Sequence, residues 1–307
     1  MISWPIRIII VVAGITCLGT ISLIMPATFD LSKSAHAVQR VSLLEIHESD
    51  LEISTQKNGD ISSTHSMPRF EDFGEKRIHE YLDACLNLGA VPEVVWTFWF
   101  GTKRMNENRF KAFDSMQNTI GVHVILLTDK NISDYARWPI HPMVQFLSGN
   151  HKSDYYRIYF SLHYGGGYGD VKNMQNSWKP LWSKFDDPKV WIVGAPETPD
   201  GMAWIPGHFP GDGFEDKVIS NGWLISRSKN PLLEKVHDMQ HDILDRNADE
   251  LIAYPPPDRN RCCAGQDPQG YPIRWTELMG ELMVFASQEY YDHLDRSMPF
   301  PNMGDYL

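Results

Sequence analysis

The residues best placed to do chemistry lie in one short stretch of the chain, 153–172. Asp154 and Arg157 are three positions apart, so a helix would present both on one face. On its own such a pair is typical of a solvated ion pair on a helix surface. However, three consecutive glycines follow and lead to Asp170, and glycine lets the backbone bend sharply or approach a ligand closely. The stretch therefore predicts that two acids and an arginine converge on one spot.

The order of these elements excludes two nucleotide-binding motifs. A dinucleotide-binding fingerprint runs from strand through glycines to helix, whereas this chain runs from a predicted helix through glycines to a predicted strand. The sequence contains no phosphate-binding loop of the form G-x-x-x-x-G-K-[ST]. The formal net charge of −11 also makes the chain a poor general binder of nucleic acid, because that affinity depends on lysine and arginine contacts to phosphate.

From Ser153 to Asp170 the chain follows the pattern S-D-x-x-R-x-x-x-x-L-x-x-G-G-x-Y-x-D. This pattern resembles the sugar-nucleotide site of glycosyltransferase family 32 and its relatives, which include Golgi mannosyltransferases and capsular polysaccharide enzymes. The resemblance extends over 91–227, and its specific part lies in 151–178. Ser161 departs from the pattern, since the family usually has an apolar residue there.

The resemblance implies a GT-A fold, a Rossmann-like sheet that binds a nucleoside diphosphate sugar. It also implies transfer of the sugar to an acceptor hydroxyl with retention of configuration. By position, Asp154 would bind ribose or sugar hydroxyls, and Arg157 would contact the sugar and orient the leaving phosphate. Asp170 matches the first acid of the family's DXD metal motif. Further donor contacts are implied for Trp99, which would stack on the base, and for Tyr168, Gly166, Gly167 and Asn221.

Two of these donor-binding residues have plain structural alternatives. Trp99 stands at the end of a predicted strand, where a tryptophan often belongs to the core. Asn221 precedes a glycine, and asparagine is common at turns and bulges.

Lys172 stands where the family has the second acid of the motif, which ligates Mn²⁺ or Mg²⁺. An ammonium group cannot ligate such a hard cation. Three interpretations stay open: Lys172 neutralises the diphosphate in a metal-independent enzyme, Asp170 holds a weak metal site with other oxygens, or catalysis has been lost. We favour the first, because it keeps a positive charge where the leaving group develops negative charge. In an extended segment, residues 170 and 172 would point to the same side.

A retaining transfer needs no dedicated base if the departing phosphate takes the acceptor's proton. An inverting reaction would need a carboxylate near the acceptor, for which Glu277, Asp212 and Asp216 are candidates that spacing does not distinguish. The segment 271–282 predicts either an acceptor wall or an ordinary amphipathic helix. Two other functions fit the same motif: a catalytically inactive relative that binds a nucleotide or glycan, and a nucleotide-sugar hydrolase.

The elements that must position these residues have the pattern of one α/β domain over 69–307. A strand, a helix and a second strand come first and favour a parallel βαβ unit. Ser153 would cap the helix that carries the motif, and Gly165 would end it. The predicted strands are 91–100, 122–127, 190–194 and 218–226, and 168–174 is predicted as a short strand or an extended turn. The predicted helices are 105–118, 153–164, 231–246 and 275–287.

Residues 1–30 predict a short cytoplasmic tail and a transmembrane signal anchor. Ile8–Met25 is almost wholly apolar, and a run of roughly 20 such residues spans a bilayer. A cleaved signal peptide is the alternative, although its apolar core is usually shorter. Residues 31–68 are polar and predict a flexible stem. We therefore expect a single-pass type II membrane protein, which would face the Golgi lumen in a eukaryote and sit in the inner membrane otherwise.

Overall fold

The computed structural model of the chain describes residues 6–7, 22–23, 68–198, 217–256 and 270–301. The chain divides into two units, Met1–Ser63 and Thr64–Leu307. In the first unit, the described residues form two short strands, β1 (Ile6–Arg7) and β2 (Ser22–Leu23), which pair antiparallel. The other described elements belong to the second unit, which has a mixed α/β fold.

The described part of the second unit is built on a six-stranded sheet with the order β4-β3-β5-β7-β6-β8. Strand β3 pairs parallel with β4 and β5, and β6 pairs parallel with β8. Strand β7 runs antiparallel to both of its neighbours, β5 and β6. The strands are β3 (Val94–Phe98), β4 (His123–Leu127), β5 (Gly166–Gly169), β6 (Ile192–Pro196), β7 (Ile219–Ser226) and β8 (Leu294–Asp295).

Strand β3 shows why the sheet has an apolar layer on each face. All its residues are buried, and they are mostly β-branched or aromatic, the types that fit a pleated surface. Successive side chains of a strand point to opposite faces. Accordingly, Trp96 packs in the apolar cluster that contains α5 and α6, whereas Val95 packs in the cluster that contains α3.

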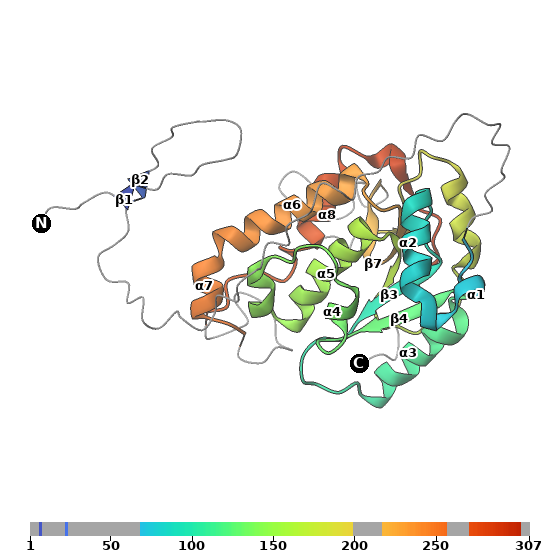
Figure 1. Cartoon of the computed structure of the whole chain (residues 1–307), viewed down its shortest axis with the longest axis horizontal. Coiled ribbons are helices and arrows are strands. Elements are labelled where there is room, and N and C mark those ends of the chain that lie inside the picture. The colour runs from blue at the N-terminus through green and yellow to red at the C-terminus, as the bar shows by residue number, and fades with distance from the viewer. Residues whose placement is uncertain (1–5, 8–21, 24–67, 199–216, 257–269, 302–307) are drawn as a thin grey trace, which may run out of the picture. The chain divides into compact units, whose positions relative to one another are not determined.

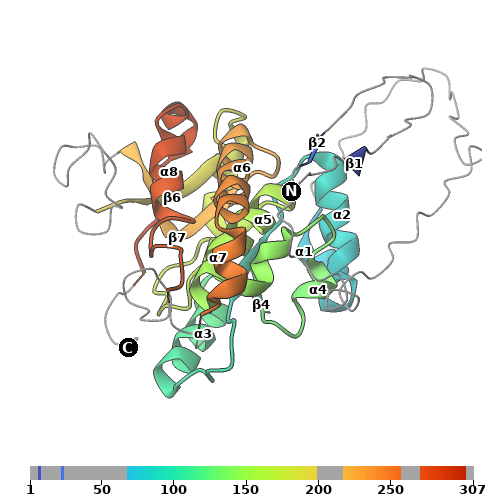
Figure 2. The same cartoon turned by 90° about the vertical axis from the view of Figure 1, so that its left-hand side faces the viewer.

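Helices cover both faces of the sheet. Helices α5 (Gly149–His163), α6 (Pro231–Arg246) and α8 (Gly280–Ser287) lie side by side over one face, as Figures 1 and 2 show. Helix α3 (Glu107–Thr119) packs on the other face. The shorter helices are α1 (Phe70–Phe73), α2 (Ile78–Leu88), α4 (Ile132–Tyr135), α7 (Ala248–Ala253) and the 3₁₀ helices η3 (Glu75–Arg77), η4 (Pro142–Phe146), η5 (Lys179–Asp186) and η7 (Tyr291–His293).

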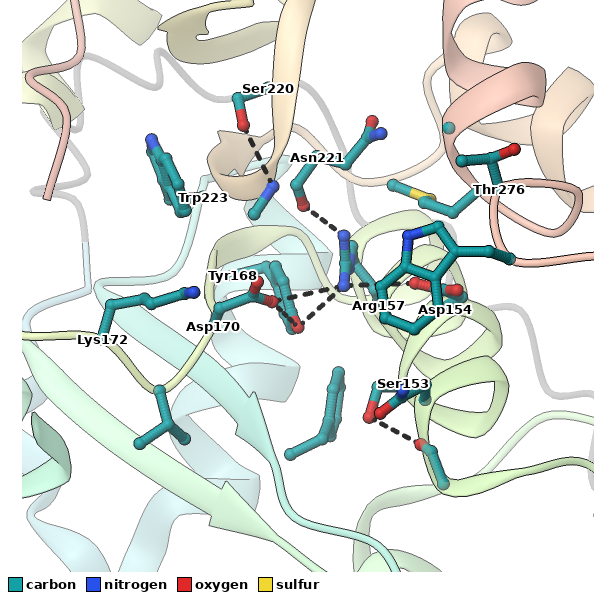
Figure 3. Close-up of a pocket in the computed structure, with 18 of the residues that line it drawn as sticks. Ser153, Asp154, Arg157, Tyr168, Asp170, Lys172, Ser220, Asn221, Trp223 and Thr276 are labelled. Carbon is teal, nitrogen blue, oxygen red and sulfur yellow. Dashed lines mark hydrogen bonds and ion pairs between the residues drawn. The ribbon is translucent and has the colours of Figure 1, made fainter. Parts of the chain in front are cut away.

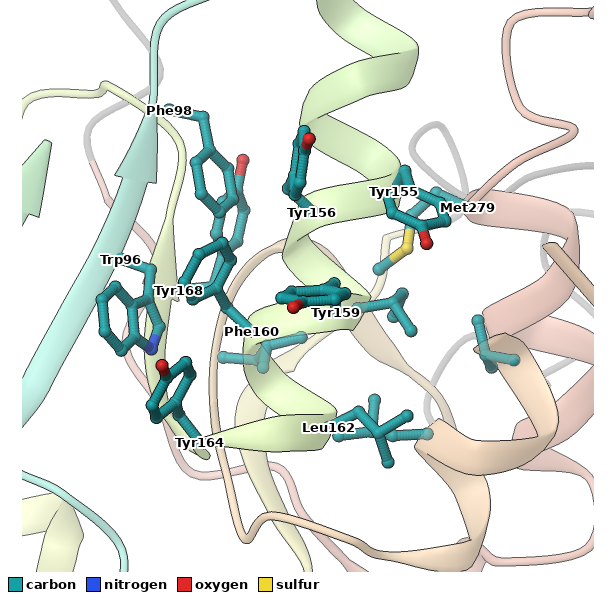
Figure 4. Close-up of a cluster of buried hydrophobic side chains, with 14 of the residues drawn as sticks. Trp96, Phe98, Tyr155, Tyr156, Tyr159, Phe160, Leu162, Tyr164, Tyr168 and Met279 are labelled. Atoms are coloured by element: carbon teal, nitrogen blue, oxygen red, sulfur yellow. The ribbon is translucent and has the colours of Figure 1, made fainter. Parts of the chain in front are cut away.

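A layer of aromatic side chains packs α5 against β3 and β5 (Figure 4). The ring centroids of Trp96 and Phe160 are 4.8 Å apart, and those of Phe98 and Tyr168 are 5.5 Å apart. The Trp96 indole also donates a hydrogen bond to the Gly165 carbonyl at 2.9 Å, which ties β3 to the end of α5. This layer fixes the helix that carries the predicted motif.

Most of the predicted elements are confirmed. Strand β3, helix α3 and strand β4 form the expected parallel strand–helix–strand unit, and α6 has the predicted bounds. The cap of α5 was predicted wrongly. Ser148, not Ser153, caps this helix, because its hydroxyl accepts the His151 N–H at 3.3 Å. Ser153 lies inside the helix and donates to the Gly149 carbonyl at 3.0 Å.

Two other elements differ from the prediction. The predicted strand 168–174 lies earlier, since β5 ends at Gly169 and Asp170 follows it. The predicted helix 275–287 begins only at α8, because side-chain hydrogen bonds hold the preceding residues in turns. The Arg274 N–H donates to Glu277 at 3.1 Å, and the Thr276 hydroxyl donates to Glu281 at 2.7 Å.

Most of the predicted anchor and stem, residues 1–5, 8–21 and 24–67, lie outside the described residues. Ser22–Leu23, which belongs to the apolar run, is paired as strand β2. In the part of the chain that the structure describes, no helix combines the length and apolar character needed to cross a bilayer.

Candidate active site

A pocket with a volume of about 830 Å³ lies at the edge of the sheet where β3, β5 and β6 end. Ligands of open α/β sheets bind outside the carboxyl ends of the strands. The pocket walls come from the residues that follow these strands, from the start of β7, from α5 and from the segment 275–280. Every predicted site residue except Gly166 and Gly167 lines this pocket.

One face of α5 gives the pocket a buried acid and a buried cation (Figure 3). Asn150, Ser153, Asp154 and Arg157 line the pocket at helical spacing. Asp154 Oδ1 lies 3.3 Å from Arg157 Nη2, and the two side chains are only 15% and 8% exposed. The structure therefore excludes the alternative of a solvated surface ion pair.

Arg157 connects the walls of the pocket. Its Nη2 lies 3.3 Å from Asp170 Oδ1 and donates to the Tyr168 hydroxyl at 3.0 Å. Its Nη1 donates to the Asn221 carbonyl, and its guanidinium carbon lies 4.2 Å from the centroid of the Tyr168 ring. Removing one partner of a buried ion pair leaves an uncompensated charge. We therefore expect the loss of Arg157 to destabilise the carboxylates that it contacts.

Asp170 is positioned by the backbone beyond the end of β5. Its N–H donates to the Gly222 carbonyl at 2.7 Å, and its Oδ1 accepts from the Tyr168 hydroxyl at 2.6 Å. Gly222 permits this approach, because a Cβ at that position would lie 3.3 Å from Asp170 Oδ2. The glycine-rich turn thus delivers Asp170 to Arg157, as the sequence predicts.

Gly166 and Gly167 serve the sheet and do not reach the pocket. Both lie in β5 between β3 and β7. Gly166 has φ +85°, and a Cβ there would lie 3.0 Å from the Val94 carbonyl oxygen. A Cβ on Gly167 would lie 2.8 Å from Val95 Cγ2. The position of these glycines therefore does not support the predicted donor contacts, and close strand packing explains them instead.

Burial shifts the pKa values of the pocket groups. It raises the pKa of the Asp154 carboxyl to about 6; Arg157 opposes the rise, and Asp170 adds to it. Burial alone would lower the pKa of the Arg157 guanidinium, but Tyr168 and the two acids raise it above its ordinary value. Burial also raises the pKa of Tyr168 well above its ordinary value. Arg157 and Tyr168 are thus fixed donors, and Asp154 titrates just below neutral pH.

Lys172 lines the pocket and is 7% exposed, although residues 170–172 lie beyond the strand in which the sequence placed them. In Figure 3 its side chain extends toward Asp170. Two further pocket cations, Lys103 and Arg109, were not predicted. Arg109 Nη1 donates to the Val171 carbonyl at 2.7 Å from a position 62 residues earlier, and no local pattern links the two.

Trp99 reaches the pocket from a braced segment after β3. Its indole Nε1 donates to the Lys103 carbonyl at 2.7 Å. The Gly101 N–H donates to Asp129 at 2.7 Å, and the same carboxylate pairs with Lys152 Nζ at 2.9 Å. Trp99 also packs against the apolar cluster on the α3 face. Trp99 therefore packs against the core and also lines the pocket, and base stacking stays a prediction.

Asn221 lines the pocket, and its side-chain oxygen is buried without a hydrogen-bond partner among the described residues. Trp275 lies in the segment 271–282, for which an acceptor wall was one of two predictions; it lines the pocket and is 58% exposed. Other lining residues were missed by the sequence analysis. Glu197 directly follows β6, and burial raises the pKa of its carboxyl. The Trp223 and Phe300 rings meet edge to face with centroids 6.0 Å apart. The aromatic residues make up 12% of the sequence and often line sugar sites, but this content does not single out these positions.

Of the candidate bases for an inverting reaction, the structure describes only Glu277. Glu277 does not line the pocket and instead pairs with Arg246 and Arg274. Asp212 and Asp216 lie outside the described residues.

The donor set around Asp170 does not fit a divalent metal ion. Mn²⁺ and Mg²⁺ require several oxygen ligands. One Asp170 oxygen already accepts from Tyr168 and faces Arg157, and the second motif position carries the Lys172 ammonium. Within the described ranges, no group of three or more His, Cys, Asp or Glu side chains is placed to hold a metal. We therefore derive no step through a metal ion.

No protein-family model matches the chain, and no curated protein matches it either. Among solved structures, it is similar to a chain titled "PaToxG Glycosyltransferase", with 13% sequence identity and a TM-score of 0.33. The match covers 60% of this chain and 75% of that one. A similarity of this size carries no argument about the site, so the function is argued from the pocket and its motif.

Proposed function

We propose that the protein is a glycosyltransferase of the GT-A type that transfers a sugar from a nucleoside diphosphate sugar to a glycan or glycoconjugate. The observation that carries this proposal is the buried Arg157, 3.3 Å from both Asp154 and Asp170 at the carboxyl edge of the sheet. Carboxylates accept hydrogen bonds from sugar hydroxyls, and a guanidinium donates to hydroxyls and phosphates. The motif resemblance assigns the same three residues to the donor site.

Catalysis in this pocket depends on position and charge. The bond between the anomeric carbon and the diphosphate oxygen breaks, and a bond to the acceptor oxygen forms on the same face of the sugar. The acceptor's proton passes to the departing phosphate oxygen, so configuration is retained. Arg157 and Lys172 stabilise the negative charge that develops on the diphosphate. Asp154 and Asp170 orient the sugar hydroxyls and hold Arg157, and Trp99 stacks on the base.

In this proposal the diphosphate is neutralised by protein cations and not by Mn²⁺ or Mg²⁺. Support comes from Lys172 at the second motif position and from the two groups, Tyr168 and Arg157, that already engage one oxygen of Asp170. Adding EDTA should therefore leave the reaction unchanged.

The test uses the full-length protein with a panel of UDP- and GDP-sugars and mixed glycan acceptors, with Mn²⁺ or with EDTA. We expect acceptor-dependent release of one nucleotide that persists in EDTA. Asp170→Asn should lower the rate about 100-fold or more, since a charged group that orients the site is lost. Asp295→Asn is the matched control, because Asp295 is 20% exposed and pairs with Lys184 outside the pocket.

The outcomes separate the competing functions. Sugar transfer to water regardless of acceptor would identify a nucleotide-sugar hydrolase. Nucleotide binding without release from any donor would identify a non-catalytic relative. A wild-type protein that neither binds nor cleaves any donor would overturn the proposed site.

We also propose that residues 1–30 anchor the protein in a membrane, type II, facing the Golgi lumen in a eukaryote and in the inner membrane otherwise. The uncharged apolar run Ile8–Met25 supports this, because its length matches the hydrocarbon core. The full chain should stay in the membrane fraction after alkaline carbonate extraction, and a chain without residues 1–30 should not. Extraction of the full chain would contradict the anchor.

A further inference from the structure

The turn after Asp170 brings together two cations from distant parts of the chain. Lys172 lies in the turn itself, lines the pocket and is 7% exposed. Arg109 lies in the first turn of α3 and also lines the pocket. Its Nη1 donates at 2.7 Å to the carbonyl of Val171, the residue directly before Lys172. Arg109 therefore contacts the turn that carries Lys172, and both residues line the pocket.

A helix cap fixes the backbone of Arg109 in the first turn of α3. The Asn106 side chain caps this helix by accepting the Arg109 N–H at 2.8 Å. A guanidinium presents its N–H donors in a planar fork, so one donor can hold a backbone carbonyl while the fork faces phosphate oxygens. The bond to Val171 thus orients the guanidinium and also fixes the turn that carries Lys172.

Arg157 and Arg109 make different contacts in the pocket. Arg157 lies against two carboxylates, Asp154 and Asp170. Arg109 donates to the Val171 carbonyl, next to Lys172 in the chain. Together Arg109 and Lys172 bring two positive charges, which equal the charge of one divalent metal ion.

We infer that Arg109 and Lys172 form a joint binding site for the diphosphate of the donor, in which Arg109 replaces part of the charge of a metal ion. This inference rests on the proposed function, and it adds a residue that the motif does not contain. It assigns Arg109 a direct contact with the substrate and not only a bracing role for the turn.

The test measures binding of inorganic pyrophosphate, of UDP and GDP, and of their nucleosides to the full-length protein by calorimetry in EDTA. The key variant is Arg109→Gln, whose side-chain amide keeps a donor for the Val171 carbonyl but has no charge. Its affinity for pyrophosphate and the bound nucleoside diphosphate should fall about 10–100-fold, the size of a lost charged hydrogen bond. Affinity for the nucleoside should not change, and the salt dependence should become shallower.

Two further variants complete the experiment. Arg109→Lys keeps the charge but loses the fork, so its salt dependence should match the wild type while its affinity falls less than that of Arg109→Gln. This variant also answers the question if Arg109→Gln folds poorly. Lys111→Met is the matched control, because Lys111 is 68% exposed on the same helix and pairs with Glu107. It should bind pyrophosphate like the wild type.

The outcomes distinguish this inference from the proposed function. If Arg109→Gln binds pyrophosphate as tightly as the wild type, Arg109 is only a brace and the inference is overturned. Absence of pyrophosphate and nucleoside diphosphate binding in the wild type would overturn it as well. If the wild type cleaves no donor but binds pyrophosphate through Arg109, the anion site stands and only the transferase function fails.

Discussion

Helix α5 separates two groups of buried ionisable side chains that differ in their partners. On the pocket side, Arg157 lies 3.3 Å from Asp154 and from Asp170. On the side that packs against α6, four imidazoles form a histidine cluster, made up of His141, His163, His237 and His241. The His237 and His241 rings lie 4.1 Å apart between centroids, and Tyr155 on α5 bonds to His241 at 3.2 Å.

Burial acts against charge in both groups, but the neighbours decide the result. In the histidine cluster, burial and, to a smaller extent, the adjacent imidazoles lower the pKa of His237 to about 4. Burial likewise lowers the pKa of His163 to about 4. His141 Nε2 lies 3.1 Å from Asp245 Oδ1 at the edge of this cluster. In the pocket, the opposite charge of Arg157 partly offsets the effect of burial on Asp154, whereas in the cluster burial favours the neutral form of His163, His237 and His241.

This difference indicates which group has a function beyond stability. Buried charges that are retained at a cavity, with a perturbed carboxyl pKa, are typical of active sites. Imidazoles such as His163, His237 and His241, whose pKa values are lowered by burial among packed helices, are instead typical of a structural core. The comparison also predicts opposite responses to pH on the two sides of α5.

The largest effect is expected from Arg157→Met. It leaves the largely buried Asp154 and the half-buried Asp170 without their cation, so the free energy of unfolding should fall by about 3 kcal/mol. Nucleotide release should fall about 1000-fold, because the leaving-group charge loses its main donor. Thermal unfolding and the release assay measure the two effects.

The control for this variant is Arg227→Met. Arg227 donates to the Val190 carbonyl at 2.9 Å and to the Phe185 carbonyl, away from the pocket. It should lose stability but keep the release rate of the folded protein. Equal release by Arg157→Met and Arg227→Met would contradict the role of Arg157.

An intermediate effect is expected from Asp154→Asn. The pKa of Asp154 is about 6 in the folded protein against an ordinary value of 3.8, so the folded state binds this proton more tightly. The stability gained from the proton is complete below about pH 4 and is lost as pH rises through 6. Asparagine cannot ionise, so the variant should be more stable than the wild type by up to about 3 kcal/mol at pH 8, with little difference at pH 4.

Calorimetric unfolding between about pH 4 and pH 8 measures this difference. Nucleotide release by the wild type should rise with pH through about 6 as the carboxylate forms, and that rise should be absent in the variant. If the free energy of unfolding changed with pH in the same way in both proteins, the pKa of Asp154 would not be raised in the folded state, and the prediction would be wrong.

The smallest effect is expected from His237→Leu. The folded pKa of His237 is about 4 against an ordinary value of 6.5, so the unfolded chain binds the proton first as pH falls. Wild-type stability should therefore decrease from about pH 6.5 down to pH 4. His237 Nε2 has no hydrogen-bond partner among the described residues, so replacing the ring by leucine should cost little at neutral pH.

In the variant, the fall of the unfolding temperature between pH 7 and pH 5 should be smaller by about 2–4 °C. Release activity at neutral pH should match the wild type, in contrast to both pocket variants. If the unfolding temperature of the variant fell with pH as much as that of the wild type, or if the variant lost nucleotide release, the proposed difference between the two sides of α5 would be contradicted.

Features that depend on neighbours in the chain could be predicted from the sequence. Helical spacing places Asp154 beside Arg157, and β-branched runs predict β3 and β4. The sequence also shows by itself that an ammonium, Lys172, stands where the resembling family has a metal ligand. These conclusions need only residue type and distance along the chain.

The tertiary structure decided what depends on residues far apart. Two serines can begin α5, and only the packed helix shows that Ser148 caps it and that Ser153 lies inside. Gly166 and Gly167 look like ligand-binding glycines, but contacts with Val94 and Val95 assign them to the sheet. Arg109 meets Val171 across 62 residues, and such long-range contacts follow from the packing of α3 on the sheet and not from any local pattern.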